Sequence, residues 1–260
     1  MRILSLGFPL PGPAIDNHTL ATAPTFFDYS AVIVDPRALS QLIEEVVDDS
    51  AEHTTRSGEQ VISASDSPTA ISLAQLLRDR LDETARLLAH GGLVVCFAYP
   101  NVIHNRVVGL PDCDRYCWLP AAPGLGYREP FLRRGFGSQL GPAEAAHPFS
   151  PFVAQFGSRL TYHAYFADAV PGFAELGRVF ARSAGGAAVG VDLCLGRGRA
   201  VFLPPPARPL SGDQRYEFSS GLQEAIGRAL DAPTPSKGGT AAEPGSAGSS
   251  VLSGKETNHG

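Results

Sequence analysis

Six apolar residues follow one another without interruption from Leu93 to Ala98, between a glycine pair and a proline. The run has the length of a strand, contains two β-branched valines and shows no polar alternation. Such a pattern is typical of a strand that is buried on both faces. Strands of this kind lie in the middle of parallel sheets that helices cover, so we expect this segment to form the centre of an α/β fold.

Other apolar segments of strand length occur at residues 1–7, 31–36, 160–166, 177–182, 187–195 and 199–203. Apolar residues recur at helical spacing at residues 39–47, 72–90 and 216–230. For the second of these helices we predict Ser72 as the N-cap and Gly91 as the C-cap. Glycine-rich turns join the last three strands, which predicts an antiparallel meander. The pattern as a whole predicts a mostly parallel central sheet with this meander at its C-terminal end.

Three stretches lack this periodicity. Residues 8–18 contain three prolines and follow the first strand, so we expect a loop there, at the edge of the sheet where ligands bind in α/β folds. Residues 48–69 are polar, with one short strand expected around Gln60 to Ile62. Residues 101–150 are rich in glycine, proline and aromatic residues and are expected to be an irregular insertion. We predict one domain over residues 1–230 and a disordered tail over 231–260, since the tail has almost no large apolar residue.

Composition narrows the classes of partner. The net charge of -5 and the 18% of charged residues argue against a nucleic-acid surface, which needs clustered basic residues. No segment approaches the roughly 18 apolar residues of a membrane span, and the N-terminus lacks the apolar core of a signal peptide. The four cysteines are sparse, as in proteins that keep their thiols reduced. We therefore expect a cytoplasmic protein that binds neither nucleic acid nor membranes.

The order of these segments resembles the class I glutamine amidotransferase-like superfamily. The matching residues are the opening strand up to Gly7, the strand 29–35, the helix leading into residues 91–95, and the closing pattern Gly196-Arg197-Gly198-Arg199 with its apolar strand. The last pattern is similar to the non-catalytic branch, which includes ThuA-like proteins and β-galactosidase trimerisation domains. The resemblance implies a flavodoxin-like three-layer sandwich and, by analogy with those relatives, also suggests a sugar-related role.

Catalytic members of that superfamily carry a nucleophilic cysteine on a tight turn and a later His-x-Glu pair. Cys96 lies near that position, but Phe97 and Ala98 follow it in place of the glycine of the turn. Prolines stand where the histidine pair would be. A thiol inside an apolar strand is unreactive. We therefore lean towards a pseudoenzyme and expect no cofactor. Cys113, Cys117 and His104 lack the spacing of a structural zinc site, so no metal is expected either.

The candidate site lies where the first and central strands end. The residues that we expect to line a pocket there are Phe8, Asp16, Asn17, His18, Tyr99 and Asn101. Asp16 beside His18 could supply a general base or a metal ligand. The same residues could also do no more than form turns and pack against the loop.

Two functions follow from these residues. The first is a non-catalytic module that binds a small ligand or another protein, as an accessory subunit of a larger bacterial-type system. The alternative is a hydrolase or transferase in which Asp16 or His18 acts as the base and meets another acid such as Asp35. The sequence leaves the ligand, the partner and the oligomeric state open.

Overall fold

β6 (Leu93–Phe97) lies between β3 (Ala31–Val34) and β13 (Gly198–Leu203) and pairs in parallel with both. All five of its residues are buried. The computed structural model describes residues 1–48, 52–54, 60–63, 68–101, 107–108, 114–121 and 125–232, which leaves nearly all of the expected tail outside the described part. The prediction that this strand is the centre of the fold is confirmed.

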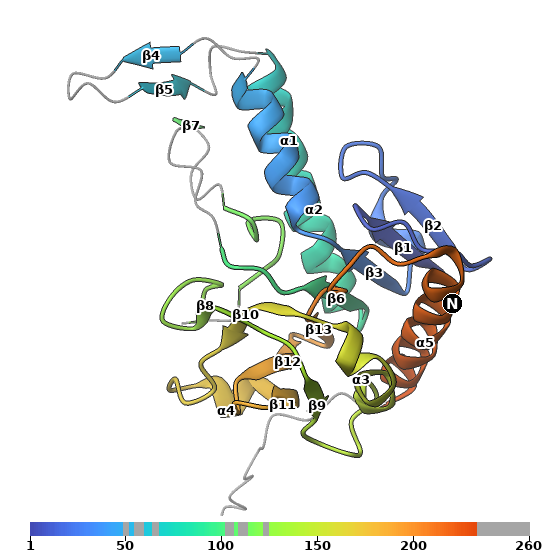
Figure 1. Ribbon diagram of the computed structural model, residues 1–260. Helices are drawn as coiled ribbons and strands as arrows, with labels where there is room; N and C mark the ends of the chain where they lie inside the picture. The colour runs from blue at the N-terminus through green and yellow to red at the C-terminus, as the bar shows by residue number, and fades with distance from the viewer. Residues whose placement is uncertain are drawn as a thin grey trace, which may run out of the picture.

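The main sheet has the order β2-β1-β3-β6-β13-β12-β10-β8, and β9 and β11 join it through β12 (Figure 1). Pairing is parallel from β2 to β13 and antiparallel beyond it. The bounds of the other strands are β1 Ile3–Leu6, β2 Ile15–His18, β8 Leu132–Gly137, β9 Leu140–Pro142, β10 Tyr162–Phe166, β11 Gly177–Ser183 and β12 Ala188–Leu195. The predicted α/β fold, with a parallel N-terminal half and an antiparallel meander of β11, β12 and β13, is therefore confirmed.

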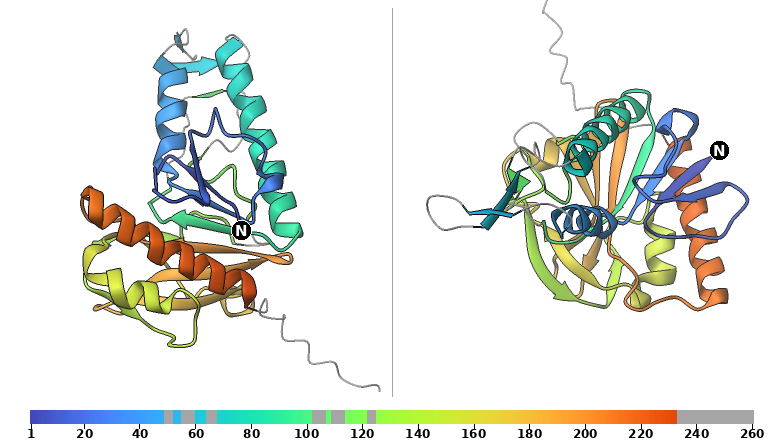
Figure 2. Two further views of the ribbon diagram at one scale, coloured as in Figure 1. Left: turned by 90° about the vertical axis from the view of Figure 1, so that its right-hand side faces the viewer. Right: turned by 90° about the horizontal axis from the view of Figure 1, so that it is seen from above.

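Helices cover both faces of the sheet, as Figure 2 shows. α1 (Arg37–Asp48) and α2 (Pro68–Ala89) lie on one face, and α3 (Ser150–Phe156) and α5 (Gly212–Asp231) lie on the other. Successive side chains of a strand point to opposite faces. Val94 and Cys96 accordingly pack in the cluster that contains α2, whereas Val95 and Phe97 pack with α3 and α5. β6 has to be apolar throughout because it contributes to both of these cores.

Of the two predicted caps of α2, the C-cap is correct and the N-cap is wrong. The helix begins at Pro68, so Ser72 is inside it, and the Ser72 hydroxyl donates to the carbonyl oxygen of Pro68 instead of capping the helix. Proline is favoured at a first helical position because its missing N–H would have no helical partner. Gly91 does end the helix: it has φ +85°, and the next residue, Gly92, donates from its N–H to the Leu87 carbonyl at 2.9 Å.

Residues 15–18 form a strand, and the prediction of a loop over 8–18 is wrong for them. β2 adds in parallel to the outer edge of β1, with Ile3 opposite Ile15 and Leu6 opposite His18. Its sequence, Ile-Asp-Asn-His, has one apolar residue, because an edge strand is held by backbone hydrogen bonds and needs little burial. Part of the expected insertion also joins the main sheet, as β8 and β9.

The remaining elements are short. A second sheet contains β4 (Glu52–Thr54), β5 (Gln60–Ser63) and β7 (Val107–Val108), and β5 is the strand expected around Gln60. The others are η1 (Phe26–Asp28), η2 (Gly157–Arg159) and α4 (Phe173–Leu176). Within the described residues, no helix is both long and apolar enough to cross a membrane.

Candidate functional site

The carboxyl ends of the parallel strands open onto one crevice. β1 is followed along the chain by its neighbour on one side, β2, and the chain then crosses to its neighbour on the other side, β3. Ligands in open α/β sheets bind at such a reversal, outside the carboxyl ends of the strands. Here each of four parallel strands delivers a residue to the same place: Phe8 after β1, Arg37 after β3, Tyr99 after β6 and Pro205 after β13.

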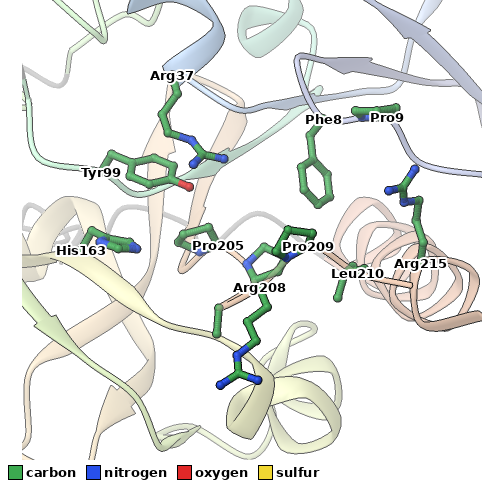
Figure 3. Close-up of a pocket in the computed structure, with 12 residues that line it drawn as sticks. Phe8, Pro9, Arg37, Tyr99, His163, Pro205, Arg208, Pro209, Leu210 and Arg215 are labelled. Atoms are coloured by element: carbon green, nitrogen blue, oxygen red, sulfur yellow. The ribbon is translucent and has the colours of Figure 1, made fainter. Parts of the chain in front are cut away.

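These residues line a cavity of about 340 Å³ (Figure 3). Such a volume is at the lower end of the range for small-molecule sites. Side chains from β10, from the proline-rich segment after β13 and from α5 complete the wall. The lining residues are Phe8, Pro9, Arg37, Tyr99, His163, Pro205, Pro206, Ala207, Arg208, Pro209, Leu210 and Arg215.

Arg37 is held in place by a buried carboxylate. Asp35, which is 4% exposed, follows β3 directly, and Arg37 is the first residue of α1. The Asp35 carboxylate accepts from Arg37 Nη2 at 2.7 Å and from Arg37 Nε at 3.1 Å, and it also accepts from the Arg37 backbone N–H at 3.0 Å. This hydrogen bonding raises the pKa of Arg37. The guanidinium is therefore charged and fixed at the mouth of the cavity.

Tyr99 lies beside Arg37 at the same end of the cavity. Its ring lies between the guanidinium of Arg37, with Cζ 4.6 Å from the ring centre, and the stacked ring of His163 at 5.4 Å (Figure 3). The backbone N–H and carbonyl of Tyr99 both bond the hydroxyl of buried Tyr116, at 2.9 and 2.5 Å. Burial, with the nearby charge of Asp35, raises the pKa of Tyr99, so its hydroxyl stays protonated.

The Tyr99 hydroxyl points into the cavity, and it has no hydrogen-bond partner within the part of the chain that the structure describes. The whole residue is only 6% exposed. The hydroxyl itself reaches the cavity, where water or a ligand can accept its hydrogen bond. This hydroxyl is therefore the donor around which a bound molecule would be oriented.

The cavity wall is positively charged. Arg37, Arg208 and Arg215 contribute to it, and none of the twelve lining residues is an aspartate or glutamate. In Figure 3, Arg215 reaches towards Pro9, whereas the guanidinium of Arg208 points away from the cavity. Just behind Tyr99, half-buried Arg115 donates to the Ser40 hydroxyl and the Pro100 carbonyl, and burial lowers its pKa.

Of the six residues expected to share a pocket, the structure brings two together, Phe8 and Tyr99. Asn101 lines a neighbouring cavity with Arg128 and Glu129, and its side-chain oxygen accepts from the backbone N–H of Arg115. The other three lie on β2 and are not among the residues that line the crevice.

Asp16 belongs to the amino edge of the sheet. Its carboxylate accepts from Arg2 at 2.7 Å and from the Tyr29 hydroxyl at 2.9 Å, and these two residues precede β1 and β3. Hydrogen bonds from Arg2 and then Tyr29 lower the pKa of Asp16. Its partners are thus separate from those of Asp35, which bonds Arg37. Asp16 and Asp35 were expected to converge, but their carboxylates bond different residues.

Asn17 and His18 hold the chain around β2. The Asn17 side chain donates to the Leu10 carbonyl and accepts from the Leu10 N–H, both at 2.8 Å, which fixes the proline-rich loop against the strand. The carbonyl of His18 accepts from the N–H of Gly7 at 3.2 Å. The contacts of Asn17 are of the kind that the sequence left open beside the chemical role, and the bond of His18 involves only its backbone.

Sequence reasoning missed Arg37, His163 and the segment from Pro205 to Leu210. A signal existed for Arg37, because it follows the end of a predicted parallel strand, as Tyr99 does. None existed for His163, which comes from the antiparallel half of the sheet. Cys96 is fully buried, and burial raises its pKa well above the usual value. Within the described residues, no group of three or more His, Cys, Asp or Glu side chains could hold a metal ion; His104 and Cys113 lie outside them.

A second polar group is buried far from the crevice. Asp192 on β12 is 0% exposed and accepts from His147 Nε2 at 2.9 Å and from Arg199 Nε at 3.0 Å. The Phe149 N–H donates to His147 Nδ1, so the hydrogen of His147 is on Nε2, which donates a hydrogen bond to the Asp192 carboxylate. Burial opposes the charge of Asp192, but the hydrogen bonds from His147 and Arg199 prevail and lower its pKa. The group ties β12 and β13 to α5, since Arg199 also donates to the Ala229 carbonyl.

Comparison with known proteins gives structural likeness only. No family model matches this chain, and no curated protein matches it. Among solved structures, it is similar to the cytoplasmic protein STM1381 from Salmonella typhimurium LT2, with 11% identity, a TM-score of 0.45, and coverage of 87% of this chain and 98% of that one. It is also similar to the cytoplasmic protein STM3548 from Salmonella typhimurium, with 9% identity, a TM-score of 0.41 and the same coverage.

Proposed function

We propose that this protein is a non-catalytic α/β module that binds a small ligand in the crevice at the carboxyl edge of its sheet. We also propose that it acts as an accessory subunit of a larger bacterial-type system. We further propose that it is related to the non-catalytic branch of the class I glutamine amidotransferase-like superfamily. One observation carries the binding site: the Tyr99 hydroxyl points into a lined cavity, and no described residue satisfies it.

The chemistry of the crevice supports binding over turnover. Its polar groups are a guanidinium held by Asp35, a phenol with a raised pKa and the ring of His163, whose pKa burial lowers. An arginine and a protonated phenol donate hydrogen bonds but do not accept a proton at neutral pH. The thiol that would act in a glutaminase, Cys96, lies inside β6 with its pKa raised by burial. Of the crevice groups named here, only the neutral ring of His163 could accept a proton, and that ring stacks on Tyr99. The set as a whole favours holding a molecule in one orientation.

The test is a thermal-shift screen of the full chain against a panel of anionic, neutral and cationic metabolites. Hits are then titrated by NMR with labelled tyrosine and histidine. We expect a hit that raises Tm, shifts the signals of Tyr99 and His163, and is recovered chemically unchanged after long incubation. Hits that shift only residues outside the crevice would contradict the binding site. Conversion of the hit, or release of ammonia from glutamine, would contradict the non-catalytic role.

A further inference from the structure

We propose that the crevice selects a small organic oxyanion with an apolar body, a carboxylate or a phosphate monoester, and binds its charged end between Arg37 and the Tyr99 hydroxyl. This inference rests on the proposed function and adds the chemical class of the ligand. It is carried by three features of the cavity: free donors at one end, an apolar wall beside them, and the sign of the surrounding charge.

The free donors of Arg37 face away from Asp35. A guanidinium has five N–H groups, and Asp35 engages those of Nε and Nη2. Both N–H groups of Nη1 and one of Nη2 therefore have no partner among the described residues and can serve a ligand. This end of a guanidinium matches the two oxygens of a carboxylate or phosphate, and such paired bonds are stronger than those to neutral acceptors.

Tyr99 adds a donor at the same end. Arg37 lies over its ring, and Figure 3 shows its hydroxyl directed into the cavity. The hydroxyl is a neutral donor, because burial keeps it protonated. An anionic oxygen that bonds both Tyr99 and Arg37 would accept from a hydroxyl that has no acceptor among the described residues.

One side of the cavity beside these donors is apolar. Phe8 hangs into it from the end of β1, and Pro205, Pro209 and Leu210 form the wall opposite (Figure 3). Phe8 is itself anchored by edge contacts with Phe97 at 4.8 Å and Phe218 at 6.0 Å. An inorganic anion would leave this surface in contact with water, whereas an aromatic or aliphatic body would cover it. The cavity therefore fits an organic anion better than a free ion.

The charge around the cavity has the sign that an anion requires. Three arginines and no acidic residue are among its described lining residues; the guanidinium of Arg208 points away from the cavity, and Asp35 offsets the charge of Arg37. Arg215 lies on the far side of Phe8 from Arg37 in Figure 3, so positive charge flanks the mouth on both sides. A cationic ligand would be repelled, and a neutral one would gain nothing from these groups.

The experiment compares matched probes by isothermal titration or NMR on the full chain. Benzoate and phenyl phosphate supply the two oxyanions, and benzamide is a neutral molecule of the shape of benzoate. Arg37→Gln and Tyr99→Phe remove one donor group each, and Arg78→Gln removes a charge from the exposed surface of α2 as a control. Circular dichroism and Tm show that each variant is folded.

We expect at least one of the two anions to bind about tenfold more tightly than benzamide. The anion that binds more tightly shows whether the crevice prefers a carboxylate or a phosphate monoester. Arg37→Gln should weaken that binding by about tenfold or more, and Tyr99→Phe by about two- to tenfold, while Arg78→Gln leaves it unchanged. Equal binding of the anions and benzamide, no binding of either anion, or full affinity in Arg37→Gln would overturn the oxyanion class. The proposed function fails separately, when the metabolite panel yields no molecule that binds at the crevice.

Discussion

Asp35 holds the guanidinium of Arg37 through two of its nitrogens, with Nη2 at 2.7 Å, and accepts the backbone N–H of the same residue at 3.0 Å. One buried carboxylate thus anchors the first turn of α1 and orients the cation at the mouth of the crevice. The fold and the candidate site therefore depend on the same pair of residues.

Asp35→Asn should lower the free energy of unfolding by about 1–2 kcal/mol, because the amide loses charge-assisted hydrogen bonds while half-exposed Arg37 is partly compensated by water. Urea denaturation monitored by circular dichroism measures the change. Asp82→Asn, on the exposed surface of α2, is the matched control and should stay close to wild type. Equal stability of the two variants would show that Asp35 does not anchor α1.

Asp192→Asn should lower the free energy of unfolding by about 3–5 kcal/mol, more than Asp35→Asn does, since it leaves the guanidinium of Arg199 buried without its counter-charge. The side chain of Arg199 is only 5% exposed, so solvent offers little compensation. Glu217→Gln breaks the exposed pair with Arg159 and should cost less than about 0.5 kcal/mol. The prediction is checked by urea unfolding of both variants, and a small loss in Asp192→Asn would contradict it.

The stability of the protein should fall on mild acidification, in part through His163. Burial, and then the charge of Arg37, lowers the pKa of His163 below its usual 6.5. The unfolded chain therefore binds a proton at a higher pH than the folded chain does, and this contribution to stability is present above about pH 6.5 and is lost as the pH falls towards the lowered pKa.

His163→Phe keeps a ring against Tyr99 and removes the titration, so the difference in Tm between wild type and this variant isolates the effect. We expect the variant to lose less stability than wild type between pH 7 and pH 5, because the other histidines titrate in both proteins. Parallel pH profiles of the two proteins would be inconsistent with the lowered pKa.

Cys96 should resist alkylation in the folded protein. Its side chain is fully buried in β6, and burial raises the pKa of the thiol, so little thiolate is present and reagents cannot reach it. Iodoacetamide at neutral pH followed by peptide mass spectrometry gives the labelled fraction at this position. The same treatment in urea should label it fully, and rapid labelling without urea would reopen the possibility of a nucleophile.

Asp16→Asn tests the alternative in which this residue is a catalytic base. Its carboxylate bonds Arg2 and Tyr29 at the amino edge of the sheet, so we expect the affinity for benzoate or phenyl phosphate to change by less than about twofold. Titration of the variant beside wild type measures this. A large loss of binding, or of any turnover found in the metabolite screen, would favour the hydrolase or transferase alternative.

The local sequence pattern was sufficient to predict β6 and the C-terminal end of α2. β6 is a strand because only an extended, fully apolar segment can contribute to the cores on both faces, and α2 ends at Gly91 because that position has a positive φ. The polar segment Ile15–His18 carried no such pattern. It became β2 because the open edge of β1 offers backbone hydrogen bonds, which depend on the neighbouring strand and not on the side chains.

The residues of the candidate site also fall into those that the sequence could place and those that it could not. Phe8 and Tyr99 could be placed together from the sequence, because the carboxyl ends of parallel strands share one edge. His163 and Arg215 join them from the antiparallel strand β10 and from α5, and the segment from Pro205 to Leu210 joins them because β13 pairs in parallel with β6; these placements depend on packing between residues that are far apart in the chain. The sequence by itself predicted the edge of the sheet at which the cavity lies. The tertiary structure decided which charges surround that edge, since side chains from separate elements meet there only when the two halves of the sheet are joined.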